Sequence, residues 1–358
     1  MRAGSQQSNA SQAANTEGAR PPICHAIILD GTLSSLDPLC RTNAGRLFGL
    51  LGALGSVVSV YYEPGLQWRD WRSAVDVASG KGINRQIKRA YGWLATRYQP
   101  GDRIFLFGYS RGAYAVRSLA GVIDLIGLLR NDCATERNIR SAYRHYECTK
   151  ESDTARRFAD VHCHDSVEIE MIGVWDTVKS LGINAPVLWR LSEHLHAFHN
   201  HDLSKVVKSG FHALAYHETR VAFSPVLWAT HDEYDGRIEQ VWFPGAHGDV
   251  GGQLGGFEEA RALANIPLVW MLERAVECGL PLPEGWKIPL HQDPLAPARG
   301  TWRGHGKFLM RRTKRIVGQD ASEHLHESVT LRETAQEAAK AELRLNGPAP
   351  KFSRSADP

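Results

Sequence analysis

The chain has 358 residues, which is enough for one large domain or two smaller ones with a substantial apolar core. Its formal net charge of +3 gives no reason to expect a nucleic-acid partner. The six cysteines include no C-x-x-C pair, which argues against a disulfide scaffold and a zinc site and favours a reducing compartment. Residues 47–62 come nearest to a membrane span, but glycines interrupt them and about 20 apolar residues would be needed.

Residues 1–22 are rich in Ser, Gln, Asn and Ala and lack an apolar segment, so we expect a disordered leader and not a signal peptide. We therefore expect a soluble, cytoplasmic protein, and leave open its export without a signal peptide. Strand-like and helix-like segments then alternate, which is typical of a parallel sheet covered on both faces. We expect one α/β domain over residues 23–330 and a C-terminal helix with a disordered tail over 331–358.

The expected elements follow in chain order. The expected strands are residues 25–29, 56–62, 103–107 and 167–174, with 238–243 as the last strand. The expected helices are residues 42–54, 83–98, 113–129 and a strongly amphipathic helix over 263–278, with a helical excursion over 135–164. Residues 66–81 have no clear period and predict a loop.

Residues 183–235 have no simple pattern and are too long for an ordinary connection, so we expect a cap of loops and helix over the site. Leu188, Trp189, Leu191 and Leu195 fall at spacings compatible with one helix face. They are expected either to line an apolar groove for substrate or to pack this helix onto the domain core.

The most informative motif is Gly108-Tyr109-Ser110-Arg111-Gly112, which stands between a predicted strand and a predicted helix. This context is typical of a nucleophile elbow, a strained turn in which a Cβ at either glycine would clash. The turn raises the Ser110 hydroxyl above the sheet and leaves the Arg111 backbone N–H free to face an oxyanion. Ser110 is therefore the predicted nucleophile; the alternative is an ordinary serine in a glycine turn.

A serine nucleophile needs a base and a carboxylate that orients the base, in the order Ser, Asp or Glu, then His for an α/β hydrolase. Asp176 and His247 each follow a predicted strand, His247 in a glycine-rich loop. The alternatives are a helix cap or Asx turn for Asp176 and a structural histidine for His247. His326 is the second choice for the base. Asp249 is expected to brace the turn that carries His247, and it would replace Asp176 only if this loop folds back.

Asp30-Gly31-Thr32 follows the first predicted strand, where such folds place a second oxyanion donor. We expect the backbone N–H of Gly31 or Thr32 to fill this role, with Asp30 organising the turn; a plain βα turn is the alternative. His194, His196, His199 and His201 form a cluster, but no accompanying carboxylate has metal-ligand spacing. A polar cap surface is the expected account, and we expect no metal and no cofactor.

Together, the motifs resemble the catalytic-domain family of type VI secretion phospholipase effectors, an α/β-hydrolase family. The matching segments are 29–32, 42–43, 60–65, 101–114, 173–178, 242–252 and 326–329, so the resemblance covers about residues 23–329. It implies a Ser-Asp-His hydrolase of ester bonds and maps Ser110, Asp176 and His247 onto the family pattern. The chain departs from the large effectors in lacking their long extra region, and its glycine-rich stretch is reduced to residues 79–82.

The first functional hypothesis is therefore a serine ester hydrolase, a lipase or phospholipase, with a lipid or small ester as substrate. The basic stretch 299–315, with Arg299, Arg312 and Arg315 among its cations, would rest on an anionic membrane or form a solvated loop. The second hypothesis is a catalytically silent binding module, and the third an acyl hydrolase of small non-lipid substrates. The sequence does not identify an immunity or secretion partner.

Overall fold

The computed structural model describes residues 20–38, 40–65, 81–148, 152–178, 202–302 and 311–346. Within these residues, seven strands form one sheet in the order β2-β1-β3-β4-β5-β6-β7, and every neighbouring pair is parallel. The strands are β1 (Cys24–Leu29), β2 (Val58–Glu63), β3 (Arg103–Tyr109), β4 (Met171–Trp175), β5 (Ser209–Ala215), β6 (Arg237–Phe243) and β7 (Glu323–Leu325).

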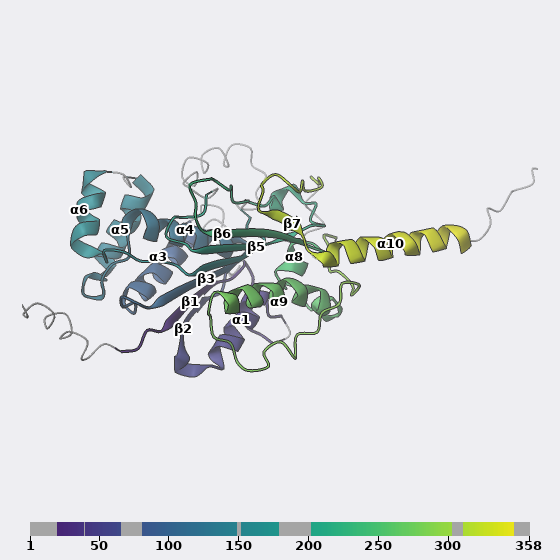
Figure 1. Cartoon of the computed structure of the whole chain (residues 1–358), viewed down its shortest axis with the longest axis horizontal. Helices are drawn as coiled ribbons and strands as arrows, with labels where there is room; N and C mark the ends of the chain where they lie inside the picture. The colour runs from purple at the N-terminus through teal and green to yellow at the C-terminus, as the bar shows by residue number, and fades with distance from the viewer. Residues whose placement is uncertain are drawn as a thin grey trace, which may run out of the picture.

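Helices cover both faces of this sheet (Figure 1). The α-helices are α1 (Asn43–Gly52), α3 (Lys81–Ala95), α4 (Arg111–Ile126), α5 (Glu136–Cys148), α6 (Asp153–His162), α8 (His247–Val250), α9 (Arg261–Glu277) and α10 (Glu327–Asn346). Short 3-10 turns are η1 (Gly55–Val57), η2 (Asn131–Cys133), η3 (Val221–Phe223) and η4 (Glu258–Ala260). The helices α3, α4 and α5 pack together on one face, and α1 and α9 lie on the other (Figure 1).

The alternation of side chains along the inner strands gives the sheet a hydrophobic core on each face. In β1, Ile27 and Leu29 join the core under α3 and α4, whereas Ala26 and Ile28 join the core under α1 and α9. All of these side chains are buried. Burying an aliphatic or aromatic side chain of this size stabilises the fold by about 1.5–3 kcal/mol, so a two-sided core holds the strands firmly in register.

The strand order places the loops that carry the sequence motifs at one edge of the sheet. β1 pairs with β2 on one side and with β3 on the other, so the chain changes direction across the sheet at β1 and β3. In open α/β sheets, the crevice at such a switch point, beyond the carboxyl ends of the strands, is where ligands bind. The architecture is the α/β-hydrolase fold, and this prediction from the sequence is confirmed.

Two strands of the sheet, β5 and β7, were missed in the sequence. Residues 209–215, which we assigned to the cap, form β5 between β4 and β6. The segment contains His212 and small residues, so it does not have the apolar pattern of a central strand. In the fold, His212 is fully buried, and its Nε2 accepts the Thr177 backbone N–H at 3.1 Å. Residues 179–201, with Leu188, Trp189, Leu191 and Leu195, lie outside the described residues.

Three further boundaries differ from the sequence prediction. Residues 238–243 are not the last strand, because β7 adds to the sheet beside β6. Helix α9 begins and ends close to the predicted bounds but is not amphipathic, since residues 263–272 are all buried. Helix α10 begins at Glu327, inside the predicted catalytic domain, and extends away from the body of the protein (Figure 1). No helix in the described part of the chain is both long and apolar enough to cross a membrane.

The amino-terminal side of the sheet is fastened by a buried carboxylate. Asp102 accepts hydrogen bonds from Arg20 at 2.6 and 2.8 Å, and its Oδ2 lies 2.8 Å from the Nε2 of His25. The Ile23 and Gln99 backbone N–H groups donate to the same carboxylate. Arg20 therefore belongs to the folded domain, although we placed residues 20–22 in the leader.

We expect Asp102→Asn to lower the free energy of unfolding by about 2–3 kcal/mol near neutral pH, because it removes charge-assisted hydrogen bonds to a buried group. Burial raises the pKa of Asp102, but the hydrogen bonds from Arg20 and the backbone outweigh it and hold the pKa well below its usual range. This stabilisation is present above the pKa of an unfolded Asp, about 3.9, and is lost as the pH falls further.

Urea denaturation at pH 7 and at pH 3 measures this effect. The difference in stability between Asp102→Asn and the wild type is expected to be smaller at pH 3. The exposed Asp132, which lies 3.7 Å from the Nε of Arg130, provides the matched control, and Asp132→Asn should change stability by less than about 0.5 kcal/mol. Equal stability of Asp102→Asn and the wild type at pH 7 would contradict the prediction.

Candidate active site

The turn between β3 and α4 has the geometry of a nucleophile elbow. Ser110 has φ 58° and ψ −119°, a conformation that is strained for a residue with a side chain. The flanking glycines allow the close approach that this turn requires. A Cβ on Gly108 would lie 2.6 Å from the Cα of Ala113, and one on Gly112 would lie 2.0 Å from the Leu29 carbonyl oxygen. Larger residues at these two positions would displace the turn from β1 and from its own helix.

The three polar residues predicted to act together lie in one hydrogen-bonded line. The Nε2 atom of His247 lies 2.9 Å from Ser110 Oγ, and its Nδ1 atom lies 2.6 Å from Asp176 Oδ2. All three side chains are buried. Each residue follows the carboxyl end of a different strand: Ser110 follows β3, Asp176 follows β4 and His247 follows β6. Parallel strands bring these ends to the same edge of the sheet, which explains why distant positions in the sequence meet here.

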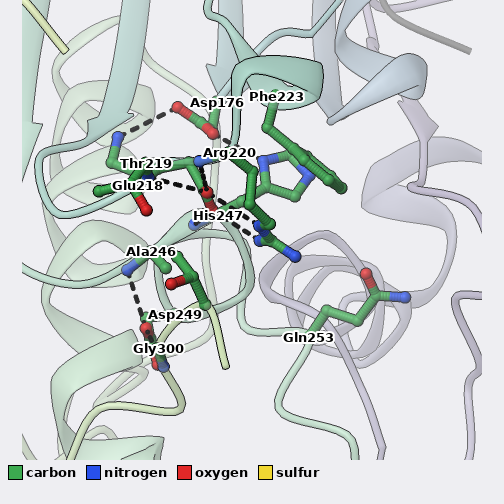
Figure 2. Close-up of polar contacts among 12 residues, drawn as sticks. Asp176, Glu218, Thr219, Arg220, Phe223, Ala246, His247, Asp249, Gln253 and Gly300 are labelled. Carbon is green, nitrogen blue, oxygen red and sulfur yellow. Dashed lines mark hydrogen bonds and ion pairs between the residues drawn. The ribbon is translucent and has the colours of Figure 1, made fainter. Parts of the chain in front are cut away.

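Two aromatic rings hold the imidazole of His247. The Tyr109 ring is stacked on it at a centroid distance of 4.9 Å. The Phe223 ring approaches it at 4.7 Å (Figure 2). Tyr109 is itself fixed by a close backbone approach, because a Cβ on Gly251 would lie 1.9 Å from its ring. These contacts restrict rotation of the imidazole. Phe223 lies within the segment that we expected to be cap, and no local sequence pattern indicates this contact.

A buried ion pair supports the backbone of His247. Glu218 Oε2 accepts the His247 backbone N–H at 3.1 Å, and Arg220 donates to both carboxylate oxygens at 2.8 and 2.6 Å (Figure 2). Burial raises the pKa of Glu218, but the contacts with Arg220 outweigh it, so the pKa lies below its usual range. The Arg220 guanidinium also covers the Phe223 ring at 4.1 Å. This pair, which sequence reasoning missed, fixes the start of α8.

Asp249 braces the same turn from its other side. Its carboxylate accepts hydrogen bonds from the backbone N–H groups of Ala246 at 2.8 Å, Arg299 at 2.6 Å and Gly300 at 3.1 Å (Figure 2). The residue therefore lies where the sequence analysis placed it, beside the loop and outside the Ser110–His247–Asp176 line. It joins the turn after β6 to residues 299–300.

Asp176 occupies a tightly defined position of its own. Its backbone has φ 43°, in the left-handed region, and its Oδ1 atom accepts the Ala215 backbone N–H at 3.1 Å. Arg315 approaches the same carboxylate, with Nη1–Oδ1 and Nη2–Oδ2 distances of 2.5 and 3.0 Å. Burial raises the pKa of Asp176, but the positive charge of Arg315 and the hydrogen bond with His247 outweigh it and hold the pKa well below its usual range.

The turn after β1 lies beside the elbow. Asp30 is buried, which raises its pKa, and it accepts hydrogen bonds from Thr42 Oγ1 at 2.6 Å and Tyr62 OH at 2.7 Å. Asp30 thus organises this turn as expected. Its Oδ1 atom also accepts the Gly31 backbone N–H at 2.6 Å, so that group is already engaged and the choice of Gly31 as oxyanion donor is wrong in this conformation. The Arg111 guanidinium donates to Thr32 Oγ1 and joins the two turns.

Other histidines singled out in the sequence lie elsewhere. The Nδ1 atom of His326 is 2.8 Å from Ser328 Oγ, and its ring packs against Phe243, so His326 does not occupy the position beside Ser110. His194, His196, His199 and His201 lie outside the described residues. Among the residues that the structure describes, no group of three or more His, Cys, Asp or Glu side chains could hold a metal ion.

The expectation that the basic stretch 299–315 rests on a membrane is wrong for Arg315, whose side chain is buried against Asp176. Arg312 donates to Thr219 and Thr301, and the Arg299 backbone N–H donates to Asp249. These contacts hold the loops around the site together. Residues 303–310 lie outside the described part of the chain.

Comparison with known proteins identifies the family of this chain. The sequence model of the type VI secretion family described as "Phospholipase effector Tle1-like, catalytic domain" matches residues 25–274. The chain belongs to this Tle1-like catalytic-domain family. The matched region contains β1 from His25 onward, β2 to β6 and the residues of the Ser110–His247–Asp176 line. The family assignment places the chain among hydrolases.

Similar proteins with individual descriptions include an uncharacterized protein of Saccharomyces cerevisiae, YEL023C. It is 30% identical over an alignment of 184 residues, and the alignment covers 44% of this chain and 27% of the yeast protein. The chain therefore spans only about a quarter of that relative.

Solved structures that are similar to the chain include the following three. An uncharacterized protein from Pseudomonas aeruginosa has a TM-score of 0.41 at 16% identity, over 76% of this chain and 49% of that one. The Tle1 effector bound to the VgrG spike of the type 6 secretion system has a TM-score of 0.33 at 19% identity, over 65% of this chain and 52% of the effector chain. The Est2 esterase of Thermogutta terrifontis has a TM-score of 0.38 at 17% identity, over 76% of this chain and 87% of the esterase chain.

Proposed function

We propose that this chain is a serine ester hydrolase in which Ser110, His247 and Asp176 form the catalytic triad, and that its substrates are carboxylic esters of lipids. The observation that carries the proposal is the position of the His247 imidazole, 2.9 Å from Ser110 Oγ and 2.6 Å from Asp176 Oδ2. Nucleophile, base and orienting carboxylate within hydrogen-bond reach are what acyl transfer by serine requires.

In the first half of the reaction, Ser110 Oγ attacks the ester carbonyl carbon while His247 Nε2 takes the hydroxyl proton. The hydrogen bond from His247 Nδ1–H to Asp176 keeps Nε2 unprotonated before this step and stabilises the imidazolium after it. His247 then returns the proton to the departing alcohol, which leaves an acyl group on Ser110. In the second half, His247 activates water, which attacks the acyl carbon and releases the acid and free Ser110.

The negative charge that develops on the carbonyl oxygen needs backbone donors. We assign the Arg111 N–H, the first of α4, to this role because it directly follows the nucleophile. The Thr32 N–H is the second donor that we propose, since the Gly31 N–H already binds Asp30. Both the backbone and the side chain of Thr32 are held in place. Gln253 Nε2 donates to the Thr32 carbonyl at 2.8 Å, and the Arg111 guanidinium donates to the Thr32 hydroxyl.

The choice of lipid esters rests on the family, whose description is that of a phospholipase catalytic domain. A panel of substrates tests it: p-nitrophenyl esters with acyl chains of increasing length, a triacylglycerol emulsion, and vesicles of phosphatidylcholine with and without phosphatidylglycerol. We expect release of fatty acid from vesicles and faster turnover of long-chain than of short-chain esters. The Ser110→Ala protein is the control for contaminating activity.

Each other outcome identifies a different function. Turnover of short soluble esters alone would contradict the lipid substrate and indicate an acyl hydrolase of small molecules. Folded protein that is neither active on any ester nor labelled by a fluorophosphonate would contradict the enzyme itself and indicate a binding module.

A further inference from the structure

Arg315 is a buried cation in direct contact with the proposed triad, and its side chain is only 6% exposed. Its two terminal nitrogens meet the two oxygens of Asp176 separately, which is the fork geometry of a bidentate pair. The same guanidinium donates to the Ala215 carbonyl at 2.9 Å and to the Phe223 carbonyl. Arg315 thus joins the orienting carboxylate to the residue whose ring packs on His247.

We propose that Arg315 is a positioning residue for the hydrolase reaction, which fixes the plane of the Asp176 carboxylate and keeps it ionised against His247. The inference rests on the proposed function. Asp176 Oδ2 lies near both His247 Nδ1 and Arg315 Nη2, so rotation of the carboxylate would lengthen both contacts together. Burial of an ionised carboxylate is costly without a paired cation, and Arg315 supplies that cation from behind the triad.

The segment that carries Arg315 is fastened to the loop after β5. Arg220 and Arg312 form an antiparallel bridge, the Val221 N–H donates to the Arg311 carbonyl at 3.0 Å, and the Thr313 N–H donates to the Thr219 carbonyl at 2.8 Å. This segment lies beyond residue 274, where the match to the family ends. The functional unit that we infer therefore extends past the matched region and requires a contribution from residues 311–316.

Several charged and titratable groups face the Asp176–His247 pair. They are Ser110 and Tyr109 from the elbow and β3, His212 from β5, Glu218 and Arg220 from the following loop, and Arg315. Burial raises the pKa of Tyr109 and lowers that of His212 to about 3, so both are neutral near pH 7. Glu218 and Arg220 balance each other. Arg315 is thus the cation whose charge acts directly on Asp176.

The decisive variant is Arg315→Met, which keeps the length of the side chain and removes its charge and its hydrogen bonds. We expect kcat/KM on a soluble p-nitrophenyl ester to fall about a hundredfold, because the triad geometry loosens. The acidic limb of the pH profile is expected to move to higher pH by on the order of one unit, since loss of this buried positive charge favours protonation of the hydrogen-bonded Asp176–His247 pair, and the added proton prevents His247 from acting as the base. Arg315→Lys should return the limb toward the wild-type position but recover the rate only in part, because ammonium lacks the planar fork.

The control for a purely structural role is Arg312→Met, in the same segment. Arg312 binds Thr219 and Thr301 and stacks on Trp302, and no contact between Arg312 and Asp176 occurs in the described structure. We expect this variant to lose thermal stability without a shift of the acidic limb. A shift of equal size in both variants would overturn the proposal.

Folded Arg315→Met with an unmoved limb and kcat/KM within about threefold of the wild type would also overturn it. If Arg315→Met does not fold, Arg315→Lys decides: a rate loss of about tenfold or more at an unchanged Tm supports the proposal, and the full wild-type rate contradicts it. Fluorophosphonate labelling of the wild type separates the two levels of inference. If Ser110 is labelled and the Arg315 variants keep the wild-type rate and pH profile, only the positioning role is refuted. If the wild type is not labelled, the proposed hydrolase is refuted.

Discussion

Ser110→Ala is expected to lower kcat/KM on every hydrolysed ester by roughly a million-fold and to abolish labelling by a fluorophosphonate. The variant removes only Oγ, which would otherwise attack the carbonyl carbon or the phosphorus of the probe. Folding should be preserved, because the elbow is held by Gly108, Gly112 and the Ser110 N–H, which donates to the Trp175 carbonyl at 3.0 Å. Loss of the Ser110 hydroxyl also removes no contact on which the conformation of the turn depends.

Mass spectrometry of the labelled protein and ester assays with purified variants measure this result. Ser118→Ala is the matched control, since Ser118 is a buried serine of the same helix α4 and lies two turns beyond the elbow. It should keep its activity and its labelling. Folded Ser110→Ala protein that hydrolyses esters at the wild-type rate would eliminate Ser110 as the nucleophile.

Asp176→Asn is expected to lower kcat by about ten-thousandfold with little change in overall structure. An amide at this position can donate to His247 Nδ1 and so stabilise the tautomer that carries its proton on Nε2, which cannot accept the proton of Ser110. The substitution also leaves Arg315 without its carboxylate in a buried site, so we expect a loss of stability of about 3–5 kcal/mol.

Ester kinetics and urea denaturation separate these two effects. Asp320→Asn provides the comparison, because Asp320 is also a hydrogen-bonded carboxylate. Burial raises the pKa of Asp320, but the hydrogen bonds from Ser322 and Thr230 outweigh it and lower the pKa to about 2. Asp320→Asn should lose stability and retain kcat. Near-wild-type kcat in a folded Asp176→Asn protein would mean that another group orients His247.

Much of the candidate site could be predicted because its residues occur in local patterns. The elbow at Ser110 is readable from five residues and their flanks, since the glycines are required by contacts within the turn and with β1. Asp176 and His247 are each recognisable as a polar residue directly after a buried strand. The rule that parallel strands end at one edge then brings them together with Ser110.

Prediction from the sequence failed where the burial of a polar group depends on partners that are distant in the chain. β5 was hidden because His212 interrupts its apolar pattern, and the fold accepts this buried histidine because its two ring nitrogens meet the Thr177 N–H and the Gln240 side chain. Asp30 and the Gly31 N–H could be placed in one turn from the sequence, but only their 2.6 Å hydrogen bond excludes Gly31 as a donor.

The sequence by itself determined the fold class and the position of Ser110, Asp176 and His247 directly after three strands, because strand patterns and tight turns are encoded by neighbouring residues. Only the tertiary structure decided the surroundings of these residues. Arg315 looked like one of several cations in a basic loop, yet it lies 2.5 Å from Asp176 in the folded chain. The charge of Arg315 can be read from the sequence, but its partner cannot. That partner depends on how residues 311–316 pack against the loop after β5, and no pattern within residues 311–316 specifies this packing.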